Sequence, residues 1–244
     1  WAKVANARVP ECQTFGSIVL NNSVGGLNPY AVDAAARDGA KVVWFPTVDT
    51  VAAIKKTEHI EEGGRRPFWL DVLLSIQADG MELKPVRILD DDGKLVPEAI
   101  EVLDVIARYN MILATGHISV REAKELIKVA KERKVEKIIC THVDSQLCFW
   151  DIEDQIEYVK KYGVYMEHCS NSCTTGKVAW DVCLNQIKSI GCEHIIISTD
   201  LGQRKHKYPD EGLLNFANWM LENGISETDV RKTICENPKQ LLFG

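Results

Sequence analysis

Ile138-Ile139-Cys140-Thr141-His142 is the stretch that decides the fold, because a short apolar run typical of a buried strand ends there on an imidazole. Three further strand-like runs have the same form, and they end on His117, His168 and Asp200. One amphipathic helix pattern lies between each of these end residues and the next. Alternating strands and helices predict a parallel α/β fold, and a TIM (β/α)8 barrel collects its functional groups at the carboxyl ends of its strands. The sequence therefore predicts a fold and the position of a site together.

Six segments of the chain have the pattern of buried strands, whereas a TIM barrel needs eight strands. They span residues 15–20, 41–45, 111–116, 138–141, 164–167 and 195–199. Residues 1–7 have the pattern of a helix that is already under way at the first residue. We therefore expect the two N-terminal βα units of the barrel to precede Trp1 or to be absent from the chain.

The composition is that of an ordinary globular protein with one domain. The chain has 244 residues, of which 45% are apolar and 26% charged, and no linker-like segment divides residues 1–244. The net charge of −6 argues against a general nucleic-acid-binding protein, which usually carries a basic face. No apolar run reaches the length of a membrane span. We expect the eight scattered cysteines to be reduced thiols, which indicates a cytoplasmic protein.

The alternation of strands and helices is interrupted between residues 47 and 96, where we expect a lid-like insertion. Residues 84–96 have the pattern of a β-hairpin with an Asp-Gly turn. Upstream of it, Arg65 and Arg66 follow two glycines and are candidates to bind a carboxylate or phosphate group of a substrate. The alternative for both arginines is a solvated loop charge.

The side chains at the predicted strand ends are of types that bind metal ions. Imidazole and carboxylate groups are good ligands for zinc and similar divalent ions. One histidine at a strand end carries little weight, because a structural role explains most of them. The joint pattern of His117, His142 and Asp200 is stronger, and it predicts a site for one or two divalent ions, with Zn²⁺ favoured.

The same strand ends resemble the amidohydrolase superfamily of metal-dependent hydrolases, near its phosphotriesterase-like and TatD-like branches. In that superfamily, strands 5 and 6 each end on a metal-ligating histidine, and strand 8 ends on an aspartate. Thr115-Gly116-His117, Cys140-Thr141-His142 and Ser198-Thr199-Asp200 match these three strands. The segment Asn237-Pro238-Lys239-Gln240-Leu241-Leu242 also resembles the end of the superfamily's terminal helix, so the resemblance spans nearly the whole chain.

One part of the superfamily pattern is missing from the chain. Strand 1 of the superfamily carries a His-x-His pair, and no His-x-His occurs in these 244 residues. Numbered back from Asp200, the strands near 15–20 and 41–45 correspond to strands 3 and 4, so the pair would lie before Trp1. A bridging lysine or glutamate is not identifiable either, since the strand at 41–45 is followed by Pro46.

The resemblance implies a metal-dependent hydrolase with a small-molecule substrate. In this hypothesis His117, His142 and Asp200 are catalytic residues as well as metal ligands, and Asp200 takes the proton from a metal-activated water. The bond that is cleaved is predicted to be an amide, lactam or imide, or an ester or lactone. The alternatives are a superfamily decarboxylase or phosphoesterase, and a non-catalytic barrel scaffold if the His-x-His strand is absent.

Two further candidates for substrate binding lie at the same predicted end of the barrel. His168 ends its strand there, with a structural role as the alternative. Asn21 opens a polar loop with two glycines, whose backbone can approach a substrate closely. The sequence leaves open whether the protein forms a homo-oligomer.

Overall fold

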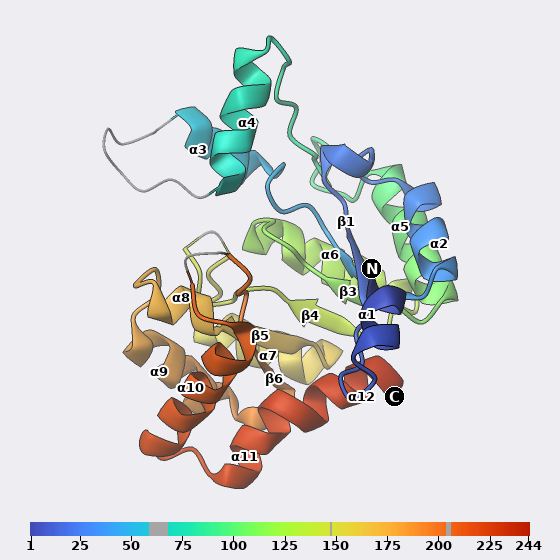
Figure 1. The fold of residues 1–244 in the computed structure, drawn as a ribbon. Coiled ribbons are helices and arrows are strands. Elements are labelled where there is room, and N and C mark those ends of the chain that lie inside the picture. The colour runs from blue at the N-terminus through green and yellow to red at the C-terminus, as the bar shows by residue number, and fades with distance from the viewer. Residues whose placement is uncertain (59–67, 147, 204–205) are drawn as a thin grey trace. The chain divides into compact units, whose positions relative to one another are not determined.

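The computed structural model describes residues 1–58, 68–146, 148–203 and 206–244, and Figure 1 shows its fold. The chain divides into two compact units, Trp1–Glu136 and Lys137–Gly244. Each unit is an α/β structure with three parallel strands among its described residues. No linker-like sequence marks the boundary, and a single domain over residues 1–244 stays a prediction.

The first unit alternates parallel strands with helices. Its strands lie in the order β1 (Gly16–Val19), β2 (Ala40–Trp44) and β3 (Ile112–Ala114). Its helices, in chain order, are α1 (Ala2–Arg8), the 3-10 turn η1 (Asn22–Val24), α2 (Pro29–Arg37), α3 (Val51–Glu58), α4 (Phe68–Ala78), α5 (Pro97–Arg108) and α6 (Val120–Glu132). The apolar side chains of β3 and the inner faces of α5 and α6 are fully or almost fully buried, so these elements supply a large part of the core of this unit.

The second unit continues the same alternation. Its strands lie in the order β4 (Ile138–Cys140), β5 (Tyr165–Cys169) and β6 (Ile195–Ser198), and both strand pairs are parallel. Its helices, in chain order, are α7 (Ile152–Tyr162), α8 (Ser170–Thr174), α9 (Trp180–Ile190), the 3-10 turn η2 (Cys192–His194), α10 (Pro209–Glu222), α11 (Glu227–Arg231), the π-helical turn η3 (Lys232–Glu236) and α12 (Asn237–Phe243). Parallel pairing brings the carboxyl ends of β4, β5 and β6 to one edge, where the site described below is built.

Helix starts follow capping signals that can be recognised in the sequence. The side chain of Asn28 accepts hydrogen bonds from the first backbone N–H groups of α2, and Pro29 occupies the first helical position. Ser119 and Glu122 form a reciprocal capping box at the start of α6. These caps fix where each helix leaves the preceding loop.

All six predicted strands are present, with ends that differ by one or two residues from the sequence prediction. The difference that matters lies in β5, which continues to Cys169 instead of ending at Glu167. Cys169 pairs with Ser198 of β6, so the sheet continues beyond the predicted strand end. This extension adds a further side chain to the functional edge.

The described part of the insertion at residues 47–96 contains the helices α3 and α4. The predicted hairpin is reduced to one antiparallel bridge between Leu89 and Leu95. Its turn is closed by the Asp90 carboxylate, which accepts hydrogen bonds from the backbone N–H groups of Asp92 and Lys94. The hairpin prediction is therefore wrong in strand length and right in the position of the turn. Whether the insertion acts as a lid stays a prediction.

The Asn-Pro segment near the end of the chain has a structural role. Asn237 is buried, and its side-chain amide donates hydrogen bonds to the carbonyl oxygens of Cys192 and Ile195 at 2.9 and 2.7 Å. These bonds tie the start of α12 to the segment that enters β6. No helix within the described ranges combines the length and the apolar character needed to cross a lipid bilayer.

Gly116, between β3 and His117, cannot carry a side chain. Its φ is 66°, and a Cβ there would lie 2.2 Å from the carbonyl oxygen of Phe45 and 2.6 Å from that of Pro46. We expect Gly116→Ala to lower the free energy of unfolding by about 3 kcal/mol, since backbone strain and a clash with backbone atoms add up. Equilibrium urea unfolding measures this loss.

Gly163 offers a matched control for that substitution. Its φ of 62° is nearly the same, and no atom lies within 4 Å of the position a Cβ would take. Gly163→Ala should therefore show only the conformational cost of about 1 kcal/mol. Equal losses in the two variants would contradict the close approach at Gly116.

Candidate functional site

His142 and Asp200 share an unusual backbone conformation. Each lies two residues beyond its strand, β4 or β6, and each has a φ of 49°, in the left-handed region. A residue with a Cβ is strained by about 1 kcal/mol there, and such strain clusters at functional sites. The other described non-glycine residues with positive φ, Asn110 and Lys134, follow the ends of helices, where this conformation is ordinary.

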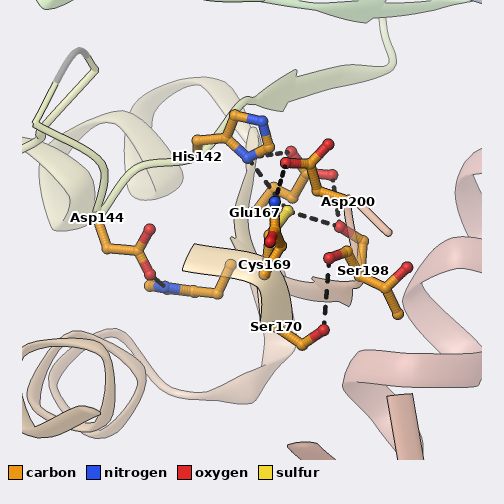
Figure 2. A network of polar contacts seen from close by, with 10 residues as sticks. His142, Asp144, Glu167, Cys169, Ser170, Ser198 and Asp200 are labelled. Atoms are coloured by element: carbon orange, nitrogen blue, oxygen red, sulfur yellow. Dashed lines mark hydrogen bonds and ion pairs between the residues drawn. The ribbon is translucent and has the colours of Figure 1, made fainter. Parts of the chain in front are cut away.

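Three different donor groups converge beside β5, as Figure 2 shows. The Nδ1 atom of His142 lies 3.1 Å from the Sγ atom of Cys169 and 3.6 Å from the Oε2 atom of Glu167. One ligand atom from each residue lies within 4.8 Å of the others. An imidazole nitrogen, a carboxylate oxygen and a sulfur are together a donor set typical of zinc.

Glu167 and Cys169 reach this cluster because they lie on the same face of β5, two residues apart. Ser198, on the neighbouring strand β6, holds both side chains in place. Its hydroxyl donates a hydrogen bond of 2.9 Å to the Oε1 atom of Glu167 and lies 2.9 Å from the sulfur of Cys169. The positions of the two donors are therefore set by strand register as well as by side-chain contacts.

The second oxygen of Glu167 fits a cation. The side chain is only 7% exposed, and Oε2 is buried with no hydrogen-bond partner among the residues that the structure describes. A buried carboxylate oxygen without a hydrogen bond costs free energy, and a bound cation removes that cost. The residues present therefore fit a divalent metal ion.

The pKa of the Cys169 thiol is raised by its surroundings. Burial raises its pKa well above the ordinary range, and the carboxylate of Glu167 raises it further. Cys169 is thus a protonated thiol in the apo protein, whereas a metal ion would bind the thiolate and displace the proton.

Asp200 is held by a residue of the short helix α8. The side-chain amide of Asn171 donates a hydrogen bond of 3.0 Å to the Oδ2 atom of Asp200. The backbone N–H of Asn171 donates to the carbonyl oxygen of Thr199, also at 3.0 Å, which fixes α8 against the end of β6. In Figure 2 the Asp200 carboxylate belongs to the same group of side chains as His142 and Glu167.

His117 lies in the first unit, directly after β3. Its backbone N–H donates a hydrogen bond of 2.9 Å to the carbonyl oxygen of Pro46. Because His142 and Asp200 belong to the second unit, a metal site that includes His117 stays a prediction.

Of the predicted substrate-binding residues, one lies in the same strand as the cluster and two lie outside the described ranges. His168 is fully buried, on the face of β5 opposite Glu167 and Cys169. Arg65 and Arg66 lie outside the described residues. For all of them, contact with a substrate stays a prediction.

The side chain of Asn21 forms hydrogen bonds within the first unit. Its amide donates to the hydroxyl of Thr47 and accepts from the Thr47 backbone N–H, both at 2.9 Å. These two bonds fasten the loop after β1 to the loop after β2. A substrate contact for Asn21 also stays a prediction.

Sequence reasoning did not find Glu167, Cys169 or Asn171. The signal for the first two is the alternation in Tyr165-Met166-Glu167-His168-Cys169, which puts an acidic residue and a cysteine on one face of a buried strand. Because the predicted strand spans residues 164–167, Cys169 lies outside it in the sequence prediction. No local signal marks Asn171, whose role depends on how α8 packs against β6.

The fold is similar to that of solved hydrolase structures. An amidohydrolase from Pseudomonas aeruginosa aligns with a TM-score of 0.54 and 14% identity, over 88% of this chain and 67% of that one. Two variants of an organophosphorus hydrolase from Deinococcus radiodurans align with TM-scores of 0.51 and 0.50 and 13% identity, over 99% of this chain and 82% of theirs. At this level of identity the likeness concerns the fold, and it confirms the predicted α/β fold of the TIM-barrel type.

Comparison at the level of sequence gives the family. No curated protein matches the chain. The model of DUF6282, described as a family of unknown function, matches residues 1–167, a span that includes β1 to β4, His117, His142 and Glu167. Since this match covers more than half of the sequence, the protein belongs to the DUF6282 family.

Proposed function

We propose that this protein is a metal-dependent hydrolase that acts on a small molecule. The observation that carries the proposal is the convergence of His142, Glu167 and Cys169 at the carboxyl ends of β4 and β5. The fold supports it, because the similar solved structures are an amidohydrolase and an organophosphorus hydrolase. The strained backbone at His142 and Asp200 supports it independently.

Three residues of the second unit would hold the ion: His142 through an imidazole nitrogen, Glu167 through the oxygen that has no hydrogen bond, and Cys169 through its sulfur. His117 of the first unit is the proposed further ligand. When bound, a divalent ion acts as a Lewis acid and makes hydroxide available near neutral pH. Zinc suits the mixture of nitrogen, oxygen and sulfur donors best.

Asp200 is the proposed general base. It would accept the proton of the attacking water and then deliver this proton to the leaving group. The hydrogen bond from Asn171 occupies Oδ2, which leaves Oδ1 to face the water and holds the carboxylate in one orientation. Asn171 is therefore a positioning residue for Asp200.

The proposed substrate bond is an amide, lactam or imide, or an ester or lactone. All of these pass through a tetrahedral intermediate whose negative oxygen a cationic site stabilises. A phosphoester is a second candidate, since one of the similar folds belongs to an organophosphorus hydrolase. Small substrates of both kinds should therefore be assayed together.

A substrate panel combined with metal depletion tests the proposed function. The protein is expressed with added zinc and assayed on lactones, esters, amides, imides and phosphotriesters, then treated with a chelator and reloaded. We expect hydrolysis of at least one class, which is lost on chelation and recovers when zinc returns. Chelator that is already saturated with zinc is the control.

Two results would contradict the proposed function. Zinc-loaded protein that hydrolyses none of these classes would favour a binding or scaffold role for the fold. Hydrolysis that survives complete removal of metal would show that the cluster at His142 is not the source of activity.

A further inference from the structure

Ser198, the last residue of β6, is a polar neighbour that Glu167 and Cys169 share. Its hydroxyl donates a hydrogen bond of 2.9 Å to the Oε1 atom of Glu167 and lies 2.9 Å from the sulfur of Cys169. A hydroxyl carries one proton, and an ionised carboxylate can only accept, so this proton belongs to the contact with Glu167. The oxygen of Ser198 is then the acceptor for the Cys169 thiol. Ser198 is therefore held from both sides in one orientation.

The hydrogen bond from Ser198 makes the two oxygens of the Glu167 carboxylate unequal. Oε1 is occupied by Ser198, whereas Oε2 is buried without a hydrogen bond among the described residues and lies 3.6 Å from the Nδ1 atom of His142. The side chain is only 7% exposed, so solvent offers Oε1 little replacement for Ser198. A carboxylate held in this way offers a cation one oxygen, because binding through both would break the hydrogen bond at Oε1.

The register of the sheet places the Ser198 hydroxyl at this point. Ser198 pairs with Cys169 across the parallel strands β5 and β6, and Glu167 precedes Cys169 by two residues on the same face of β5. The backbone therefore holds the hydroxyl within reach of both side chains. A substitution at position 198 can thus remove the hydroxyl while the pairing of the two strands stays.

A carboxylate that binds through one oxygen favours a particular class of metal ion. Zinc typically takes a tetrahedral set of ligands, and nitrogen, sulfur and a single carboxylate oxygen suit it. Calcium takes a larger number of oxygen ligands and often uses both oxygens of a carboxylate. Manganese also prefers oxygen ligands from carboxylates, carbonyls and water. Holding Glu167 to one oxygen therefore favours zinc over ions that need more oxygen ligands.

We propose that Ser198 is a positioning residue that holds Glu167 to one-oxygen binding and thereby sets the preference of the metal centre for zinc. The inference rests on the proposed metal centre at His142, Glu167 and Cys169, and it adds a reason for the selectivity of that centre. Ser198 acts through Glu167 and is not itself a ligand. Loss of a residue that orients a metal ligand typically lowers metal affinity by about ten- to a hundred-fold.

Two variants of nearly equal shape test the role of the hydroxyl. Ser198→Thr keeps the hydroxyl and Ser198→Val removes it, and both side chains suit a β-strand. We expect Ser198→Val to bind zinc about ten- to a hundred-fold more weakly than Ser198→Thr, whereas the affinity for Mn²⁺ does not fall. Competition with a chromophoric chelator measures both affinities. An equal loss for the two ions would overturn the proposed preference for zinc.

Cobalt spectra of the same two variants report on the coordination itself. Co²⁺ in a tetrahedral site has strong visible absorption bands, and these bands weaken when more ligands bind. Released from Ser198, Glu167 can bind through both oxygens and raise the number of ligands. We therefore expect weaker visible bands in Ser198→Val than in Ser198→Thr, both measured on protein saturated with Co²⁺. A purely structural effect at position 198 would lower the affinity and leave the bands of the saturated protein unchanged.

Ser17 offers a control position for these substitutions. It is an exposed residue of β1, in the first unit, and it belongs to neither group of potential metal ligands among the described residues. Ser17→Val should therefore keep the zinc affinity and the cobalt bands of the unaltered protein. If the added methyl group prevents Ser198→Thr and Ser198→Val from folding, Ser198→Ala is compared with the unaltered protein, with the same loss expected.

Equal zinc affinity and equal cobalt bands in Ser198→Thr and Ser198→Val would overturn the role of Ser198. So would the same loss in both variants, because it would not depend on the hydroxyl, and so would a loss of affinity with unchanged bands. A protein that binds no zinc would remove the metal centre and this inference together. Failure of the hydrolase proposal alone is a separate result, since it is measured by turnover on the substrate panel and not by metal binding.

Discussion

Asp200→Asn should lower kcat by about a thousand-fold on the substrate that the panel identifies, a loss of about 4 kcal/mol of transition-state stabilisation. The amide of asparagine cannot accept the proton of the attacking water near neutral pH. KM should change little, because the carboxylate acts in the chemical step and not in substrate binding. Steady-state kinetics on the zinc-loaded protein measures both constants.

The fold should tolerate this substitution for a local reason. Asparagine adopts the left-handed conformation at least as readily as aspartate, so the φ of 49° at position 200 adds no new strain. Its carbonyl oxygen can still accept the hydrogen bond from Asn171. Asp210→Asn, an exposed aspartate in the first turn of α10, is the matched control and should keep full activity. Unchanged kcat in a zinc-loaded Asp200→Asn protein would remove Asp200 from the mechanism.

His142→Asn should remove about one equivalent of bound metal and abolish turnover. The imidazole is the donor that contacts both Glu167 and Cys169, so its loss leaves an incomplete set of ligands. Asparagine is again chosen because it accepts the φ of 49° at this position. Elemental analysis after dialysis against a weak chelator measures the metal content.

A second histidine provides the control for His142. His194 lies directly before β6, at the amino end of the strand, and packs against the ring of Tyr165 with 5.1 Å between ring centroids. His194→Asn removes the same functional group and should leave both metal content and turnover intact. A His142→Asn protein that retains all of its metal would show that the ion is held elsewhere.

The fold class could be predicted from the sequence because its signals are local. Apolar runs of strand length, capping residues such as Asn28 and Ser119, and the helix patterns between them depend on near neighbours in the chain. Strand ends are less certain, since they depend on which partner strand continues the pairing. β5 reaches Cys169 because Ser198 of β6 pairs with it, and that contact is distant in sequence.

The candidate site was predicted in part for the same reason. His142 and Asp200 stand at strand ends, where a residue pattern reveals them. Glu167 and Asn171 act through contacts with β6 and with Asp200, and only the packed structure brings these groups together. His168 shows the converse, because a histidine near a strand end can face the buried side and serve the fold instead.

The two faces of β5 thus carry different chemistry. Glu167 and Cys169 face the edge with His142 and Ser198, whereas His168 faces the buried pair formed by Asp144 and Cys183. Alternation along one strand of five residues separates the candidate functional site from a fully buried polar contact.

Anomalous diffraction from crystals of the zinc-loaded protein tests the central claim most directly. Data recorded on either side of the zinc absorption edge locate the ion without reference to activity. We expect a strong anomalous peak bounded by His142 Nδ1, Glu167 Oε2 and Cys169 Sγ. Crystals of protein that contains zinc by elemental analysis but show no peak at this position would contradict a metal centre at the carboxyl ends of β4 and β5.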